Sequence, residues 1–261
     1  MLRSLHSAAT GMKAQQTFID VTSNNLANVN TTGFKRSRVN FQDLMYQTQD
    51  APGADVAQGV RKPTGIQVGN GVRTGSVQKE FGDGAVRVTN NATDIRIVGQ
   101  GFFRVQLPNG QGFAYTRDGA FQRNEQGQLV TSGGYLLDPP ITVGVDAVSV
   151  SIGEDGVVST QLANGQNVNA GTIQTASFVN PAGLKAMGGN LFQESPASGN
   201  AQQGTPGTPG FGVLQSGALE MSNVTAVEEM ISLITAQRAF EFNSKSVQAS
   251  DQMLRELSNL R

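Results

Sequence analysis

The chain has 261 residues, with 19 Lys and Arg against 20 Asp and Glu, so its formal net charge of −1 argues against a nucleic-acid-binding surface. Cys and Trp are absent and His occurs once, at His6, which excludes a disulfide framework, a thiol nucleophile and a metal site built on Cys or paired His. Asn and Gln number 43 and outnumber the 39 charged side chains, so we expect a neutral surface rich in amides.

Residues 1–33 predict one amphipathic helix. Positions in steps of three and four follow one seam: Leu2, Leu5, Ala9, Met12, Gln16, Ile19, Ser23 and Leu26. We expect the helix to stop between Asn25 and Gly33, because Asn and Gly tolerate the left-handed backbone that ends helices. No apolar run there is long enough for a cleaved secretory signal, and no stretch of the chain is apolar enough to insert into a membrane.

Residues 34–70 have little apolar periodicity and predict an extended arm. Its segment 46–68 runs from Tyr46 to Val68 and contains Pro52 and Pro63, which restrict backbone freedom. Because this segment cannot build a core of its own, we expect it to lie along neighbouring subunits.

Residues 71–201 predict an all-β domain of many short antiparallel strands, either a distorted barrel or a sandwich. Short runs rich in Val, Ile, Phe and Thr alternate there with turn signals such as Asp118-Gly119 and Asn164-Gly165. No helical crossover separates the runs, which disfavours a parallel sheet.

Residues 202–222 contain a Gly/Pro-rich return linker, and residues 223–261 predict a second long helix without Gly or Pro. Thr225 and Glu228 have the spacing of a capping box. The apolar stripe of this helix is Val224, Val227, Ile231, Ile234, Ala239, Phe242, Ala249, Met253, Leu257 and Leu260. Ile231 and Phe242 lie eleven residues apart, which argues against a plain left-handed coiled coil over the whole length.

No candidate for catalysis or cofactor binding emerges. Gly99 and Gly101 lack the third Gly, the Lys and the helix of a phosphate loop, so a turn before a strand is favoured. The carboxylates of Glu154 and Asp155 lack calcium-loop spacing, and Asp118 sits where Asp usually caps its own backbone. We therefore predict a protein that is not an enzyme and binds no cofactor or metal.

Interaction remains as the function class. The two helices could pair only within the chain, as an antiparallel hairpin, or complete their cores against neighbouring copies. The polymerisation interface that the stripes predict is Leu2, Leu5, Met12, Ile19, Leu26, Val227, Ile231, Ile234, Phe242, Met253 and Leu257.

The N-terminal run SAATGMKAQQTFIDVTSNNLANVNTTGFK resembles the signature that bacterial flagellar rod and hook proteins share. Its most specific positions are Asn24, Asn25, Leu26, Ala27, Asn28, Thr32, Gly33 and Phe34. The runs VGQGFFRV, FVNPAGLKAMGGNLFQES and LEMSNVTAVEEMISLITAQRAFEFNSK more narrowly resemble the distal rod proteins of the flagellar basal body. Arg96 departs from this pattern, because the family usually has a small residue there.

The resemblance implies an α+β subunit whose terminal helices pair as a coiled coil and whose copies form a helical polymer. This polymer is the distal rod, a drive shaft that transmits torque from motor to hook and encloses the export channel. Its location runs from the periplasm to the outer membrane, reached by type III export without a cleaved signal. Implied partners are further copies, the proximal rod and hook proteins, the L and P ring proteins, the rod cap and the export apparatus.

Two alternatives stay open at this point. Within the same class, the chain could be a proximal rod or hook subunit, and segment 46–68 favours the distal rod because it resembles the arm that distinguishes distal rod proteins from hook proteins. In a different class, it could be a secreted adhesin or fibre subunit, although such a stalk would favour a continuous heptad pattern.

Overall fold

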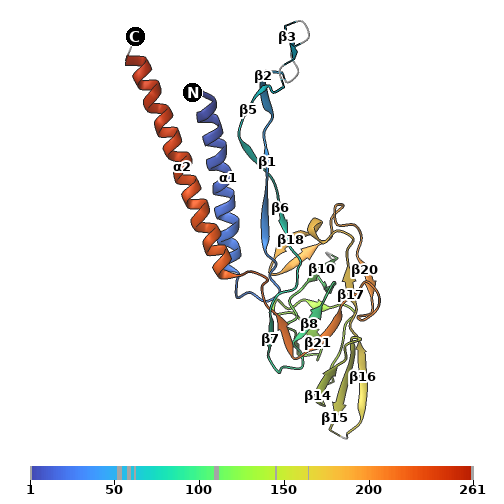
Figure 1. Ribbon diagram of the computed structural model, residues 1–261. Coiled ribbons are helices and arrows are strands. Elements are labelled where there is room, and N and C mark those ends of the chain that lie inside the picture. The colour runs from blue at the N-terminus through green and yellow to red at the C-terminus, as the bar shows by residue number, and fades with distance from the viewer. Residues whose placement is uncertain are drawn as a thin grey trace. The chain divides into compact units, whose positions relative to one another are not determined.

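The structure is a computed structural model that describes residues 2–51, 55–57, 60–61, 63–108, 112–144, 146–163 and 165–259. The chain divides into two compact units (Figure 1). Unit 1 comprises Met1–Leu26, Ser37–Gln78 and Thr225–Arg261, and unit 2 comprises Ala27–Arg36 and Lys79–Val224. The order of elements is helix, strands and helix, as the sequence predicts.

Two helices belong to unit 1. Helix α1 spans Leu2–Ala27 and α2 spans Ala226–Asn259. Helix α1 ends inside the predicted window, and Gly33 beyond it has a φ of +66°, the left-handed conformation that ends the turn. Before α2, Thr225 hydrogen-bonds through its hydroxyl to the Glu228 carboxylate, and Glu229 N–H donates to Thr225 C=O at 3.1 Å.

The rest of unit 1 is an antiparallel ribbon. Strand β1 (Ser37–Asp43) pairs with β6 (Val72–Lys79), β2 (Tyr46–Asp50) pairs with β5 (Ile66–Gly69), and β3 (Asp55–Ala57) pairs with β4 (Val60–Arg61). The expected arm is therefore extended, but it folds back on itself and its backbone groups are paired across the ribbon. The sequence predicts a boundary between the arm and the β domain at residues 70 and 71. In the structure β6 completes this ribbon, so residues 72–78 belong to unit 1.

Unit 2 contains the predicted antiparallel strands. Its nine-stranded sheet follows the order β11 (Gln122–Arg123), β12 (Leu129–Val130), β13 (Leu136–Leu137), β9 (Phe102–Gln106), β10 (Phe113–Thr116), β19 (Leu191–Gln193) and β18 (Lys185–Gly188), with β17 (Thr175–Ser177) on β9 and β20 (Gln202–Gly204) on β17. A 3-10 turn, η2 (Pro181–Gly183), precedes β18. A second sheet has three strands, β14 (Ala147–Ile152), β15 (Val157–Leu162) and β16 (Asn167–Thr172).

The predicted barrel is wrong, because the strands that the structure describes form open sheets. The predicted return linker, residues 202–222, is partly strand: β21 (Val213–Ser216) pairs with β8 (Ile95–Val98), and β22 (Ala218–Glu220) pairs with β7 (Val86–Val88). Its Gly/Pro-rich residues 205–212 lie outside the strands. Glycine allows a close approach at the entry to β21, since a Cβ at Gly212 would lie 2.3 Å from the carbonyl oxygen of Val98.

The core of unit 2 is built from aromatic and branched side chains. Phe103 packs edge-on against Phe121 with ring centroids 5.0 Å apart, inside a cluster that includes Ile95 and Leu137. On the other face, Phe102 and Phe178 form a second cluster with centroids 5.7 Å apart. The aromatic side chains of these two clusters are thus buried within one chain.

Candidate functional site

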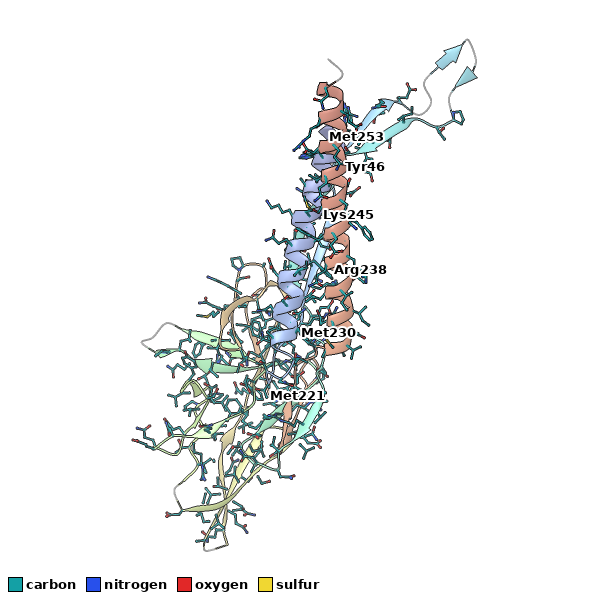
Figure 2. The ribbon with its side chains drawn as sticks, turned by 90° about the vertical axis from the view of Figure 1, so that its left-hand side faces the viewer. Tyr46, Met221, Met230, Arg238, Lys245 and Met253 are labelled. Atoms are coloured by element: carbon teal, nitrogen blue, oxygen red, sulfur yellow. The ribbon has the colours of Figure 1, made fainter. Side chains whose placement is uncertain are left out.

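Helices α1 and α2 run antiparallel and lie side by side (Figures 1 and 2). Their contacts join small or polar side chains: Ser4 with Ser250, hydroxyl oxygens 3.3 Å apart; Gly11 with Asn243, whose Nδ2 would lie 2.9 Å from an added Cβ; and Asn25 with Glu229, whose Oε2 accepts from Asn25 Nδ2 at 3.3 Å. Each step of seven or fourteen residues along α1 is matched by the same step back along α2. The contact line therefore has heptad spacing.

On α2 we call this contact line the inner line. It continues in steps of four and three: Glu229, Leu233, Ala236, Phe240, Asn243, Val247, Ser250 and Leu254. All of these except Phe240 are buried or half-buried. Small residues let two helix backbones approach, so Ala236 and Ser250 are only 2% exposed. The positions facing α1 are thus not the apolar stripe that the sequence pattern selected.

Part of the predicted apolar stripe lies on the opposite side of α2, namely Val227, Ile231, Ile234, Phe242, Ala249 and Met253, whereas Val224 is buried and Ala239 is half-buried. We call this face, with the two basic residues on it, the outer stripe: Val227, Ile231, Ile234, Arg238, Phe242, Lys245, Ala249 and Met253. At 3.6 residues per turn these positions share one face, diametrically away from the inner line. The five large apolar side chains in it, Val227, Ile231, Ile234, Phe242 and Met253, are 47–66% exposed. The outer stripe therefore does not face α1. Its use in a helix–helix contact stays a prediction, because no described residue is shown packed against it.

The outer stripe repeats every eleven residues. Ile231, Phe242 and Met253 mark one such line, and Val227, Arg238 and Ala249 mark another. Arg238, Lys245 and Met253 follow one another along α2 in Figure 2. A period of eleven suits nearly straight or slightly right-handed packing, whereas the inner line suits left-handed packing. The eleven-residue step that the sequence shows is thus a property of one face of α2.

The predicted interface residues of α1 are half-buried. Leu5, Met12 and Leu26 each follow by one position a residue that contacts α2, and Ile19 follows Phe18, whose ring centroid lies 6.1 Å from that of Phe41. All four side chains keep part of their surface exposed. The side chains of Leu2 and Leu257 lie outside those that the structure describes.

The signature segment has a structural role in each unit. In unit 1, Asn25 bridges to Ser37: its Nδ2 donates to Ser37 C=O and its Oδ1 accepts from Ser37 N–H, both at 2.9 Å. In unit 2, Gly33 N–H donates to Glu220 C=O at 2.8 Å, and Thr32 Oγ1 donates to Asp118 Oδ1 at 3.1 Å.

Two other signature positions, Asn28 and Phe34, also make side-chain contacts. Asn28 Oδ1 accepts from Thr31 Oγ1 at 3.2 Å, and the Phe34 ring lies under Lys79 Nζ at 4.8 Å. Leu26 is half-buried, and Asn24 and Ala27 are exposed. The signature therefore fixes how the chain leaves α1.

A cluster of buried charged side chains lies in unit 2, where the residue that follows the signature segment meets strand β22. Lys35 Nζ donates to Glu220 Oε1 at 2.6 Å and to Gly82 C=O at 2.8 Å. Arg117 lies 3.5 Å from Glu220 Oε2 and donates to Gly99 C=O at 2.8 Å. Burial lowers the pKa of the Lys35 ammonium and of the Arg117 guanidinium, and the charge of Glu220 opposes that shift. Sequence reasoning missed this cluster, because isolated charged residues give no burial signal.

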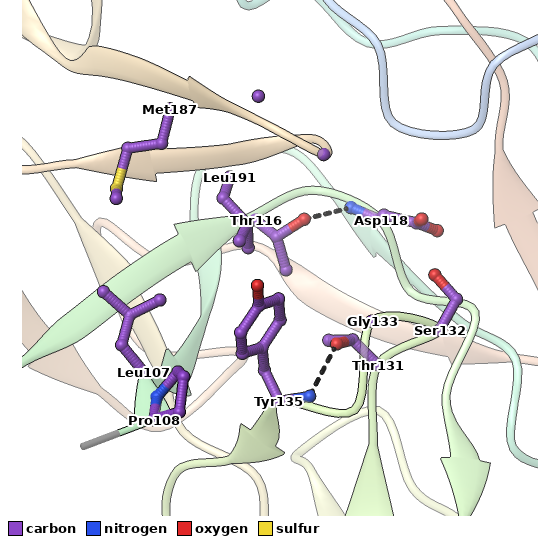
Figure 3. Close-up of a pocket in the computed structure, with 12 residues that line it drawn as sticks. Leu107, Pro108, Thr116, Asp118, Thr131, Ser132, Gly133, Tyr135, Met187 and Leu191 are labelled. Atoms are coloured by element: carbon purple, nitrogen blue, oxygen red, sulfur yellow. Dashed lines mark hydrogen bonds between the residues drawn. The ribbon is translucent and has the colours of Figure 1, made fainter. Parts of the chain in front are cut away.

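A cavity of about 530 Å³ lies beside β13 in unit 2 (Figure 3). The ring of Tyr135 points into it, and Asp118 supplies the one carboxylate among its described lining residues. Asp118 accepts from Ala120 N–H at 3.2 Å, so it caps its own turn as the sequence predicts. Burial raises the pKa of this carboxyl, against the hydrogen bonds from Ala120 and Thr32. A single carboxyl used in this way is no acid–base pair.

The remaining positions singled out in the sequence are the residues of segment 46–68 and Arg96. Tyr46, Pro63 and Val68 are exposed in the ribbon, and Pro52 lies outside the described residues. Arg96 is buried in β8, where its Nη1 donates to Gln215 Oε1 on the paired strand at 3.5 Å.

Among the described helices, none is long and apolar enough to cross a membrane. Within the same residues, no group of three or more His, Cys, Asp or Glu side chains is placed to hold a metal ion.

Comparison with known proteins assigns the class. The family described as "Flagella basal body rod protein" matches residues 5–35, "Flagellar hook protein FlgE/F/G D1 domain" matches 96–160, and "Flagellar basal body rod FlgEFG protein C-terminal" matches 215–260. These are families of flagellar rod and hook proteins, and none of them is a catalytic family.

Individual relatives narrow the class. The flagellar basal-body rod protein FlgG of Buchnera aphidicola subsp. Schizaphis graminum is 47% identical over 261 residues, covering all of both chains. Its counterparts from Caulobacter vibrioides and Bacillus subtilis are 47% and 43% identical, again over the whole of both chains. The chain therefore belongs to the flagellar basal-body rod proteins, and its relatives at this identity are those named FlgG. A solved Helicobacter pylori flagellar hook protein, FlgE2, aligns at 15% identity with a TM-score of 0.24, over 71% of this chain and 43% of that one.

Proposed function

We propose that this chain is a structural subunit that polymerises helically into the distal rod of the flagellar basal body. The observation that carries the proposal is the outer stripe of α2, a row of large apolar side chains left exposed while the inner line is already used. Several large apolar side chains exposed on one face of a helix usually mark an interaction site. Fully burying one such side chain stabilises a complex by about 1.5–3 kcal/mol, so the stripe can drive assembly.

The finer parts of the proposal follow from this role. The rod transmits torque from motor to hook and encloses the export channel, with the paired terminal helices as its inner layer. Its subunits reach the periplasm and outer membrane through the flagellar export apparatus without a cleaved signal. Proximal rod and hook proteins, the L and P ring proteins and the rod cap are its neighbours.

The test places a charge on the outer stripe. Ile231→Asp and Phe242→Asp each put an unpaired carboxylate into the proposed contact, where burial costs several kcal/mol. Electron microscopy and sedimentation of purified protein should show tubes for the wild type and only monomers for these variants. Gln248→Asp is the matched control, because Gln248 is exposed on α2 away from both the inner line and the outer stripe. Normal tubes from both stripe variants would remove the stripe from the assembly contact.

A second part of the proposal concerns stiffness. Segment 46–68 should hold the rod straight by lying along neighbouring copies, as its exposed Tyr46, Ile66 and Val68 support. Because β2 pairs with β5, the segment is a folded-back ribbon, and its reach is about half of a fully extended 23-residue chain, on the order of 35 Å.

Deleting most of residues 46–68 tests that role. We expect the shortened chain to fold and polymerise, but to give curved or flexible rods in electron micrographs. A rod that stays straight would assign stiffness to unit 2 or to the terminal helices.

A further inference from the structure

Unit 1 contains a cavity of about 460 Å³ between α1 and the β1–β6 ribbon. Its lining residues come from one face of α1 and from the strands beside it: His6, Thr10, Lys13, Ala14, Thr17, Leu44, Val72, Arg73 and Thr74. Three of these side chains are basic, three carry hydroxyl groups, and no carboxylate is among them. The cavity therefore has the composition of a site for an anionic group.

The guanidinium of Arg73 is held in position by a neutral amide and not by a carboxylate. Its Nε and Nη2 both donate to Gln42 Oε1, at 3.2 and 3.0 Å. Because this partner is a neutral amide, Arg73 keeps its full charge, and its remaining N–H groups are free for a second acceptor. Lys13 and His6 are exposed on α1, and neither makes an ion pair within the part of the chain that the structure describes.

The walls of the cavity approach each other closely where β6 begins. Val72 N–H donates to Thr10 Oγ1 at 3.4 Å, and a Cβ at Gly71 would lie 2.2 Å from that oxygen. Gly71 has a φ of +110°, so only glycine fits this turn against α1. The basic side chains therefore project from a fixed frame, which reduces the entropic cost of binding.

We infer that this cavity, which we call the cationic pocket, receives a carboxylate side chain from a second copy of the chain. The inference rests on the proposed function, because it treats the pocket as one contact of the polymer. An Arg guanidinium beside an ammonium binds a carboxylate through parallel charge-assisted hydrogen bonds. The pocket is the positive half of a contact whose negative half lies on the same sequence.

Charge balance supports a second copy as the source. Unit 1 has ten Lys and Arg against nine Asp and Glu, whereas unit 2 has nine against eleven, so the acidic excess lies in unit 2. Glu154 and Asp155 are adjacent, exposed and without an ion pair among the described residues. This turn is the first candidate for the occupant. The other exposed carboxylates without such a pair in unit 1 are Asp20, Asp43, Glu241 and Glu256.

Charge reversal in the full-length chain tests the pocket. Arg73→Glu and Lys13→Glu should each raise the concentration needed for polymerisation about tenfold, as expected for the loss of one well-oriented ion pair. Arg123→Glu makes the same change of charge at an exposed position of unit 2 outside the pocket, and should leave that concentration unchanged. Circular dichroism confirms that each variant is folded. If wild type and pocket variants polymerise at the same concentration, the inference is wrong although the proposed function stands.

A second reversal identifies the occupant. In the Arg73→Glu background, Glu154→Lys with Asp155→Lys, or a change to Lys at Glu125, at Asp146 or at one of the four unit 1 carboxylates, should restore polymerisation. Restoration by none of them would overturn a carboxylate of this chain as the occupant. Because the chain has no Cys, a Lys13→Cys variant paired with Cys at the restoring position should cross-link only in the polymer.

Inorganic phosphate tests whether the cationic pocket binds a small anion from solution instead of a carboxylate of a second copy. The free wild-type chain should show no phosphate binding beyond the general effect of ionic strength, measured by calorimetry with chloride at equal ionic strength as the reference. Saturable binding that depends on Arg73 would make the pocket a small-anion site and overturn the inference. A wild-type chain that never polymerises would instead contradict the proposed function itself.

Discussion

The two units use the same kinds of side chain in opposite ways. In unit 2, Phe102, Phe103 and Phe121 are at most 2% exposed, whereas in unit 1 Phe242 is 66% exposed. Ion pairs differ similarly: Lys35 and Glu220 are buried in unit 2, but Asp251 and Arg255 pair on the exposed surface of α2. Unit 2 thus buries its core within one chain, whereas unit 1 leaves the outer stripe exposed, which the proposed function assigns to contacts between copies. We therefore expect unit 2 to fold without other copies and the polymer to cover the exposed face of unit 1.

The largest expected effect tests the self-sufficiency of unit 2. Glu220→Ala leaves Lys35 and Arg117 buried without their shared carboxylate, so it should lower the free energy of unfolding by about 3–5 kcal/mol. Urea unfolding followed by circular dichroism measures the loss. Glu125→Ala, at an exposed position, should change it by less than about 0.5 kcal/mol. Equal effects of the two changes would mean that the ion cluster does not stabilise unit 2.

Amide exchange compares the units directly in the free chain. We expect slow exchange in the strands of unit 2 and exchange at least a hundredfold faster in α1 and α2, a gap of about 2.7 kcal/mol. Polymerisation should then slow exchange in both helices. Equal protection of both units in the monomer would favour a stable helix hairpin within one chain.

A smaller effect tests the chain segment that enters unit 2. A Cβ at Gly33 would lie 2.6 Å from Asp118 N, and the φ of +66° disfavours any other residue. Gly33→Ala should therefore cost about 2–3 kcal/mol of unfolding free energy, measured by thermal unfolding. Gly134→Ala is the control, because Gly134 also has a positive φ but an added Cβ meets nothing within 4 Å. A control that loses as much as Gly33→Ala would assign the cost to backbone conformation alone.

The smallest effect concerns Asp118. Because burial raises its pKa, the folded state binds a proton at a higher pH than the unfolded state, and the ionised carboxylate opposes folding at neutral pH. Asp118→Asn keeps an acceptor for Ala120 and Thr32, so it should stabilise unit 2 slightly at pH 7. That advantage should fade as pH falls through the raised pKa, where the wild-type carboxyl becomes neutral. An advantage that grows on acidification would contradict this sign.

The sequence predicted what repeating patterns and turn residues can encode. Apolar spacing located both helices, the Asn and Gly residues after Asn25 located the end of the first, and short apolar runs between turn signals located the β-rich region. The pairing face of α2 was missed, because Gly11, Asn243 and Ser250 give no hydrophobic signal although their heptad spacing was visible. Lys35 and Glu220 were missed because 185 residues separate them and nothing in a single sequence pairs distant charges.

The two repeats on opposite faces of α2 have a consequence for how subunits can be arranged. If α2 were shifted along its axis by seven residues, its inner line would still match α1. The outer stripe would then no longer match a neighbouring copy that contacts it. A slide of eleven residues would restore the outer stripe and misalign the inner line. No displacement shorter than the 34-residue helix satisfies both faces. If copies contact the outer stripe as proposed, the two repeat lengths on α2 together allow only one axial position of each copy along the polymer.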